Sequence, residues 1–228
     1  LLEGKAPNSK KLNMAYYNLS LVYSFINRDS SVYYTDLTIE KSKKSKDAYL
    51  HVSGLHNRFN HYLEAHKYAE ALKLHKEITK IMTEHPFFSV KVLYHDYLLG
   101  IIYNRMNKSD ECIDAFSVFI TKAKENKEIS TNERNQLLCQ SYVTLTTEVI
   151  KNKDFETGER YLDSATVYLN YPGNQQLTRV IELVKIHILV GKEQFKKAEQ
   201  KTIDYWNSLN DKEKRLEGDK IGQIFYNI

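Results

Sequence analysis

Apolar residues recur along the chain at intervals of three and four positions, which is the spacing of one face of an α-helix. One such run consists of Leu99, Ile102, Tyr103 and Met106. Strict alternation of apolar and polar residues over a strand length is absent, and no Asn-Gly or Asp-Gly pair marks a β-hairpin. The pattern therefore predicts an all-α protein.

Capping and helix-breaking residues divide these runs into about eleven helices. Ser130 and Glu133 have the spacing of a capping box at the start of one helix. Pro86 and the Pro172-Gly173 pair end two others. The helices are short enough to pair as antiparallel hairpins, followed by a single terminal helix over 211–226. The predicted hairpins span residues 12–44, 47–84, 89–126, 130–170 and 175–209.

A sequence motif recurs within these hairpins. An apolar helical run ends in an aromatic residue or a substitute for one, a short polar loop follows, and the next helix begins near a small residue. The best copy is Leu99-Gly100-Ile101-Ile102-Tyr103, followed by Cys112 and Phe116. Weaker copies lie around Tyr23, Tyr62, Val149 and His187. Repetition on this scale predicts stacked helical hairpins.

These residues resemble the tetratricopeptide repeat, whose motif is Trp-x2-Leu-Gly-x2-Tyr on one helix and Ala-x3-Phe on the next. The third hairpin reads Asp96-x2-Leu99-Gly100-x2-Tyr103, followed by Cys112-x3-Phe116. The resemblance covers nearly the whole chain. It implies one repeat domain over 1–228, wound as a right-handed superhelical solenoid. Equivalent small residues are about forty positions apart, against 34 in the family, so we expect an irregular superhelix.

The resemblance also implies a binding surface, because the first helix of each hairpin lines a concave groove in this family. Aromatic rings beside Asn and Arg suit a peptide ligand, since rings bury apolar area and the polar groups bind backbone or carboxylate. The alternative is that the tyrosines pack between hairpins, as aromatic stripes at helical spacing commonly do. Transferring the family's register gives the candidate contacts Tyr17, His56, Asn60, Tyr94, Tyr97, Asn104, Arg105 and Lys151.

Histidines recur every five residues at His51, His56, His61 and His66. That spacing rotates successive side chains by about 140° around a helix, so they cannot share one metal ion. The chain has no Gly-x-Ser-x-Gly elbow and no glycine-rich phosphate loop. We therefore expect no catalytic residue, no metal and no cofactor in this segment. His75 and His187 fall on apolar faces, where packed, hydrogen-bonded core residues are expected.

The amino-acid composition and the net charge limit the kinds of partner that the chain is expected to bind. Of 228 residues, 42% are hydrophobic and only three are proline, which suits a packed core and excludes a disordered chain. The net charge is only +4, with lysines scattered among carboxylates, so we expect no nucleic-acid partner. No apolar run approaches the ~18 residues of a membrane span, so no membrane insertion is expected. One basic cluster suits a helix end, with contact to an anionic partner as the alternative: Lys41, Lys43, Lys44 and Lys46.

Cys112 and Cys139 both fall on apolar faces of predicted helices. The expectation is two buried thiols that act as small hydrophobic side chains. A disulfide between successive helices is the alternative, and the compartment stays open on this evidence.

Residues 29–34 and the lysine-rich helix end that follows them indicate the kind of protein in which this chain functions. This stretch is similar to divergent tetratricopeptide regions of bacterial signalling proteins. That resemblance implies a sensory segment that binds a protein or peptide, or associates with itself, and it favours an extracytoplasmic position over a cytoplasmic one. The chain starts at Leu1, so we expect a fragment with possible output or membrane segments outside it. The alternative is a free-standing adaptor or scaffold in a multiprotein assembly.

Overall fold

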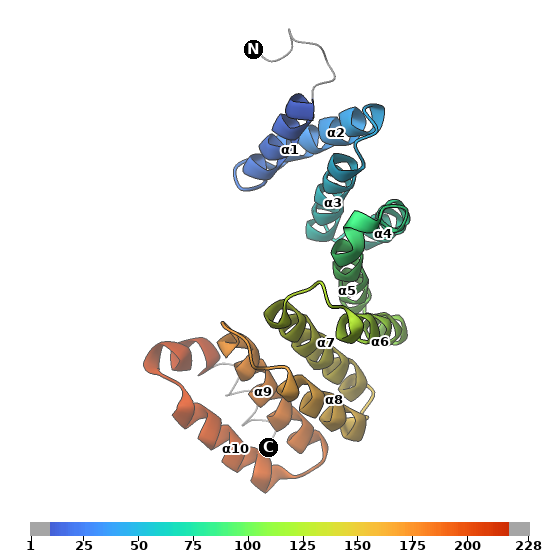
Figure 1. Ribbon diagram of the computed structural model, residues 1–228. Helices are drawn as coiled ribbons and strands as arrows, with labels where there is room; N and C mark the ends of the chain where they lie inside the picture. Colours follow the sequence, from blue (N-terminus) through green and yellow to red (C-terminus); the bar gives the residue numbers. More distant parts are fainter. Residues whose placement is uncertain (1–9, 219–228) are drawn as a thin grey trace. The chain divides into compact units, whose positions relative to one another are not determined.

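The computed structural model describes residues 10–218, and all regular structure in this part of the chain is helical (Figure 1). Most helices pack on a helix that is next to them in the sequence, so the predicted all-α fold of stacked helices is confirmed. The elements are α1 (Lys10–Ser24), α2 (Arg28–Lys44), α3 (Ala48–Glu64), α4 (Tyr68–Thr83), η1 (Pro86–Phe88), α5 (Ser89–Arg105), α6 (Ser109–Glu125), α7 (Thr131–Lys151), α8 (Phe155–Val167), α9 (Gln175–Gly191) and α10 (Phe195–Ser208).

The observed helices begin and end within a few residues of the predicted ones. The 3₁₀ turn η1 was not expected, and it arises where Pro86 ends one helix and starts the approach to the next. Of the predicted terminal helix over 211–226, residues 211–218 are helical and the remainder lie outside the described residues. Contacts divide the chain into two compact units, Leu1–Met106 and Asn107–Ile228. The single repeat domain and its right-handed superhelix stay predictions.

Side-chain caps explain why several helices start where they do. Asn27, Asp47 and Asp154 each accept a hydrogen bond from the backbone N–H three residues later, at 2.9–3.0 Å. Ser130 Oγ accepts from the Glu133 N–H at 3.3 Å and donates to the Glu133 carboxylate at 2.6 Å. The predicted pairing of Ser130 with Glu133 is therefore present, with the hydroxyl as a partner of the carboxylate.

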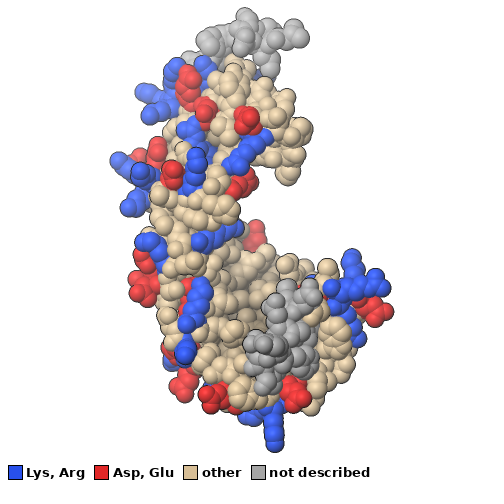
Figure 2. Space-filling model, turned by 180° about the vertical axis from the view of Figure 1, so that it is seen from behind, with Lys and Arg blue, Asp and Glu red and all other residues tan. Residues whose placement is uncertain are grey.

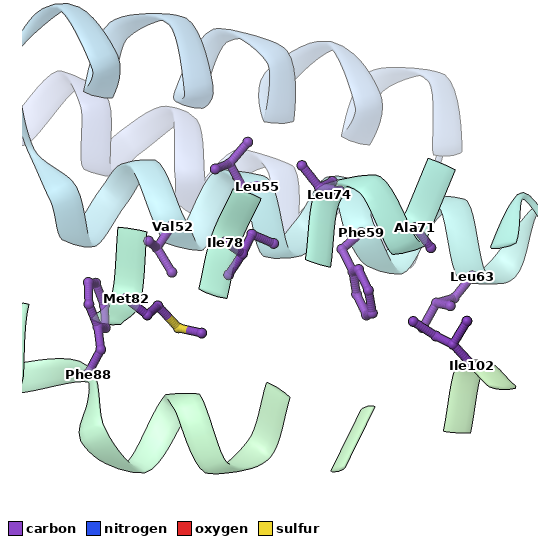
Figure 3. Close-up of a cluster of buried hydrophobic side chains, with 10 residues drawn as sticks. All are labelled: Val52, Leu55, Phe59, Leu63, Ala71, Leu74, Ile78, Met82, Phe88 and Ile102. Carbon is purple, nitrogen blue, oxygen red and sulfur yellow. The ribbon is translucent and has the colours of Figure 1, made fainter. Parts of the chain in front are cut away.

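The core of the first unit lies among α3, α4, η1 and α5 (Figure 3). Aromatic and branched side chains meet there without access to water; Phe59, Ile78 and Ile102 are all fully buried. Such side chains give about 1.5–3 kcal/mol each when buried. The cluster consists of Val52, Leu55, Phe59, Leu63, Ala71, Leu74, Ile78, Met82, Phe88 and Ile102.

Helix α2 packs through small hydroxyl residues instead of large apolar ones. Its buried stripe consists of Ser31, Thr35, Thr38 and Ser42. The Thr38 hydroxyl donates to the Tyr34 carbonyl at 2.8 Å, which satisfies a buried polar group within the helix. A Cβ atom at Gly54 of α3 would lie 2.9 Å from Ile39 Cγ1. The two helices therefore approach more closely than large side chains would permit.

In the second unit, the centre is the long helix α7, which buries Leu138 and Leu145 completely. Gly158 of α8 lies against it, and a Cβ atom there would be 2.7 Å from Ile150 Cγ2. The α7 and α8 backbones therefore approach closely at this glycine. Cys112 and Cys139 are both buried thiols, as expected.

Basic and acidic side chains are interspersed on the face shown in Figure 2. Lys41, Lys43 and Lys44 occupy the last turn of α2, as predicted, and Lys44 pairs with Glu40 at 2.7 Å. Among the described residues, no helix is both long and apolar enough to cross a membrane.

Candidate functional site

A hollow lies in the second unit, between α7 and α9. It is a groove of about 430 Å³ with an apolar wall from both helices and a few polar groups. Helices α7 and α9 are the first helices of the fourth and fifth predicted hairpins. The lining residues are Thr147, Ile150, Lys151, Val180, Leu183, Val184 and His187.

A buried carboxylate holds the basic side chain of this groove. The Glu148 side chain has no exposed surface. One of its oxygens accepts from Lys151 Nζ at 2.6 Å, and the other accepts from Ser109 Oγ at 2.6 Å. Half of the Lys151 side chain stays exposed. Because an ammonium group has three donors, Lys151 has donors beyond the one used by Glu148.

His187 corrects one sequence-based expectation. It was expected as a packed core residue, yet it is exposed and lines the groove. The physical reason is that α9 carries apolar residues both on its core side and on its groove side. The buried residues of α9 are Ile181, Val184, Ile186 and Ile188, whereas the His187 side chain is exposed at the groove. His75, given the same expectation, is buried at 5% exposure, and its Nε2 lies 2.9 Å from the His95 carbonyl oxygen.

The groove wall from α9 was missed by sequence reasoning. Val180, Leu183, Val184 and His187 are spaced by three, one and three positions, which is a helical stripe. This helical spacing was visible in the sequence. However, the same helix has a second apolar stripe, so periodicity alone cannot tell which stripe faces the core and which faces the groove. Among the candidate contacts predicted from the sequence, Lys151 lines this groove.

The other candidate contacts lie on α1, α3 and α5 of the first unit. Arg105 is exposed, and the remaining six are partly buried. Tyr17 is partly buried, and this burial, with a contribution from the Tyr49 phenol of α3, raises the pKa of its phenol. The partly buried candidates are Tyr17, His56, Asn60, Tyr94, Tyr97 and Asn104.

His56 has an environment that its groove assignment did not predict. Its Nδ1 lies 3.2 Å from Nε2 of His95, a buried residue of α5. Its ring stacks on Phe59 at a centroid distance of 5.9 Å. Burial lowers the pKa of His56, and Lys91 adds to this effect. His95 was not singled out from the sequence, where it is one isolated histidine in an aromatic helix.

The thiols are poor nucleophiles. Burial raises the pKa of Cys112 to about 12, with a contribution from Glu148, and burial raises that of Cys139 to about 11. Thiolate is the reactive form, so these side chains are inert at neutral pH. Within residues 10–218, no group of three or more His, Cys, Asp or Glu side chains has the arrangement of a metal site.

Comparison of the chain with protein-family models, with curated protein sequences and with solved structures found no match.

Proposed function

We propose that this segment is a non-catalytic, tetratricopeptide-like interaction module. The observation that carries the proposal is the α7–α9 groove, with four aliphatic side chains in its lining and Lys151 and His187 beside them. Aliphatic walls bury apolar side chains of a ligand, while a small number of polar groups fix its orientation. Thr147 and Lys151 supply such groups from α7.

The ligand that fits this chemistry is a peptide segment with aliphatic side chains next to a carboxylate. Lys151 is anchored by Glu148 but keeps free donor capacity at the groove. A carboxylate of the ligand would accept from this ammonium group and form a charge-assisted hydrogen bond. The contact would orient the peptide, and burial of its aliphatic groups would supply most of the affinity.

Display of a random peptide library against the full chain tests the proposal. Selected peptides are expected to combine aliphatic residues with an acidic residue or a free carboxyl end. Val180→Glu places a carboxylate in the groove wall and should weaken the Kd of such a peptide by at least about tenfold, which is ~1.4 kcal/mol. Val180 is only partly exposed, so its variant needs a folded-state check by circular dichroism.

Val167→Glu is the matched control, because Val167 is 73% exposed on α8 and does not line the groove. This variant has the same change in charge and side-chain type and should keep the wild-type Kd. Equal losses of affinity in both variants would refute the groove as the binding site.

Two settings suit such a module, and they remain those inferred from the sequence. One is the sensory or interaction region of a bacterial signal-transduction regulator, and the other is a free-standing adaptor in a multiprotein assembly. The reading frame around the segment distinguishes them. A membrane helix followed by an output domain supports the regulator, and a separate open reading frame supports the adaptor.

A further inference from the structure

Three histidine rings meet inside the first unit, where α3, α4 and α5 pack together. They come from different helices: His56 from α3, His75 from α4 and His95 from α5. His56 Nδ1 lies 3.2 Å from His95 Nε2, and His75 Nε2 lies 2.9 Å from the His95 carbonyl oxygen. The His95 ring centroid is 5.3 Å from that of His56 and 5.0 Å from that of His75. His95 is therefore the central ring of the three.

The surroundings of this cluster are apolar. Phe59, which is fully buried, has its ring centroid 5.5 Å from that of His95. His95 Nδ1 is buried and has no hydrogen-bond partner among the described residues. A protonated imidazole carries an N–H at both nitrogens, so a charged His95 would have an unpaired donor in the core. Such a donor is costly to bury.

Few nearby charges stabilise protonated rings in this place. Lys91 of α5 acts on His56, and Lys76 of α4 acts on His75; both oppose a positive charge. Asp96 of α5 favours it at His75 only. Burial is the largest cause at all three rings, and it lowers the pKa of His95 to about 3, with contributions from His75 and His56.

The opposite side of α3 carries two more histidines. His61 Nε2 lies 3.2 Å from Ser31 Oγ, and His51 Nδ1 lies 3.4 Å from Ser42 Oγ, both on α2. The five-residue spacing that prevents a shared metal site thus distributes rings over both interfaces of α3. Burial lowers the pKa of both. The charged groups that act on them are Arg28, Arg58 and Glu64 at His61, and Lys43 and Glu77 at His51.

We propose that the first unit is an acid-sensitive switch, in which protonation of His56, His75 and His95 drives the rings out of the α3–α4–α5 interface and opens these helices. An exposed histidine takes up a proton near pH 6.5. The closed state binds fewer protons, so falling pH favours the open state from about pH 6.5 downward. Each ring released from the core shifts the equilibrium by up to about tenfold per pH unit in this range. Opening would expose the cluster around Phe59.

Hydrogen exchange of the full chain, measured by mass spectrometry at pH 7.5 and pH 5, tests the switch. Exchange times are first corrected for the intrinsic pH dependence of amide exchange. Peptides from α3, α4 and α5 should lose protection by at least about tenfold at pH 5. Peptides from α7 and α8 should keep their protection, because neither helix contains a histidine. Unchanged protection of α3–α5 at pH 5 would overturn the proposal.

The double variant His56→Asn with His95→Gln removes two of the titrating groups. The Asn amide oxygen can take the place of Nδ1 of His56 as acceptor, and the Gln amide nitrogen can take the place of Nε2 of His95 as donor, so the contact between these two positions is kept. This variant should lose much less protection at pH 5 than the wild type. The control is His66→Asn, because His66 is an exposed turn residue of the same unit with φ 56°, a conformation that Asn tolerates. The control should lose protection as the wild type does.

Equal acid-induced loss in the double variant and the wild type would show that the buried rings do not cause the opening. If the double variant does not fold, ring titration of the wild-type chain by NMR decides instead. The expected result is that the rings of His56, His75 and His95 stay neutral until the unit opens. Rings that titrate near pH 6.5 inside a closed unit would overturn the switch.

Discussion

At the scale of single residues, five turns between helices each contain a non-glycine residue in the left-handed region. These are Lys46, His66, Asn107, Lys153 and Glu193, with φ between 53° and 62°. Glycine is the usual residue here, because a Cβ atom makes this conformation unfavourable by about 1–2 kcal/mol. The surrounding backbone bonds compensate; after α7, for example, the Asp154 N–H donates to the Val149 carbonyl at 3.2 Å.

Replacing Lys153 by glycine should therefore stabilise the second unit. The left-handed strain is relieved, and the greater freedom of glycine in the unfolded chain offsets part of the gain. We expect an increase of about 0.5–1 kcal/mol in the free energy of unfolding, measured by urea denaturation followed through the fluorescence of Trp206. Lys153→Ala keeps the Cβ atom and removes the charge, so it should show little change. A gain of the same size with alanine would mean that charge, not backbone strain, is responsible.

The roles of single residues could be predicted from the sequence where the role depends only on the residue type and its local position. Ser130 caps a helix, and Cys112 is buried because a small sulfur-containing side chain suits an apolar face. It failed where tertiary contacts decide. Lys153 has no sequence signal for a left-handed turn, and His187 lies on a helix whose apolar residues surround it on most sides. His95 gains its environment from α3 and α4, which are distant in sequence.

At the scale of helices, close packing depends on small residues at few positions. Gly158 of α8 faces Ile150 of α7, and a Cβ atom at Gly158 would also lie 3.7 Å from Ile188 of α9. Glycine within a helix costs about 1 kcal/mol relative to alanine. Glycine is nevertheless favoured at position 158, because α7, α8 and α9 come together there and leave little room for a side chain.

Gly158→Leu should separate these helices. Leucine improves helix propensity, but its side chain has to displace Ile150 and Ile188. Overpacking of this kind costs about 1–3 kcal/mol, so a net decrease in the free energy of unfolding is expected. Thr166→Leu adds leucine at an exposed position of the same helix and should not lower stability. Urea denaturation of both variants checks this, and a Gly158→Leu midpoint equal to wild type would contradict the observed α7–α8 contact.

Helix boundaries were predictable from the sequence because caps, prolines and periodicity act locally. Which side of each helix faces the groove was not. Helix α9 has apolar residues on both its core side and its groove side, and the stripe from Val180 to His187 resembles a core stripe in every local respect. Only the positions of α7, α8 and α10 around α9 determine which of its sides faces the core and which faces the groove.

At the scale of the whole molecule, the two units differ in their content of titratable rings. Seven of the eight histidines belong to the first unit, whereas the second contains only His187, which is exposed. The division between Met106 and Asn107 has no local signal, since it follows from the density of contacts in a folded chain. The uneven distribution of histidines, in contrast, can be counted in the sequence. Its consequence for stability follows only from the structure, which shows that several of these rings are buried.

This asymmetry predicts that acid destabilises the units unequally. The neutral histidines buried in the first unit bind protons when it unfolds, so its free energy of unfolding falls as pH decreases from about 6.5 toward the lowered pKa values, about 3 for His95. Trp206 is the single tryptophan and lies on α10, so its fluorescence reports the second unit. Far-ultraviolet circular dichroism reports the helices of both.

Urea denaturation followed by both probes should therefore show midpoints that separate further at pH 5 than at pH 7.5, with the dichroism signal lost first. If the two units were thermodynamically coupled, part of the loss of stability in one would be transmitted to the other. An equal shift of both probes would show that this coupling is strong enough for the chain to respond to acid as one cooperative body. A larger shift of the Trp206 signal would place the acid-sensitive groups in the second unit and contradict the role of the buried histidines.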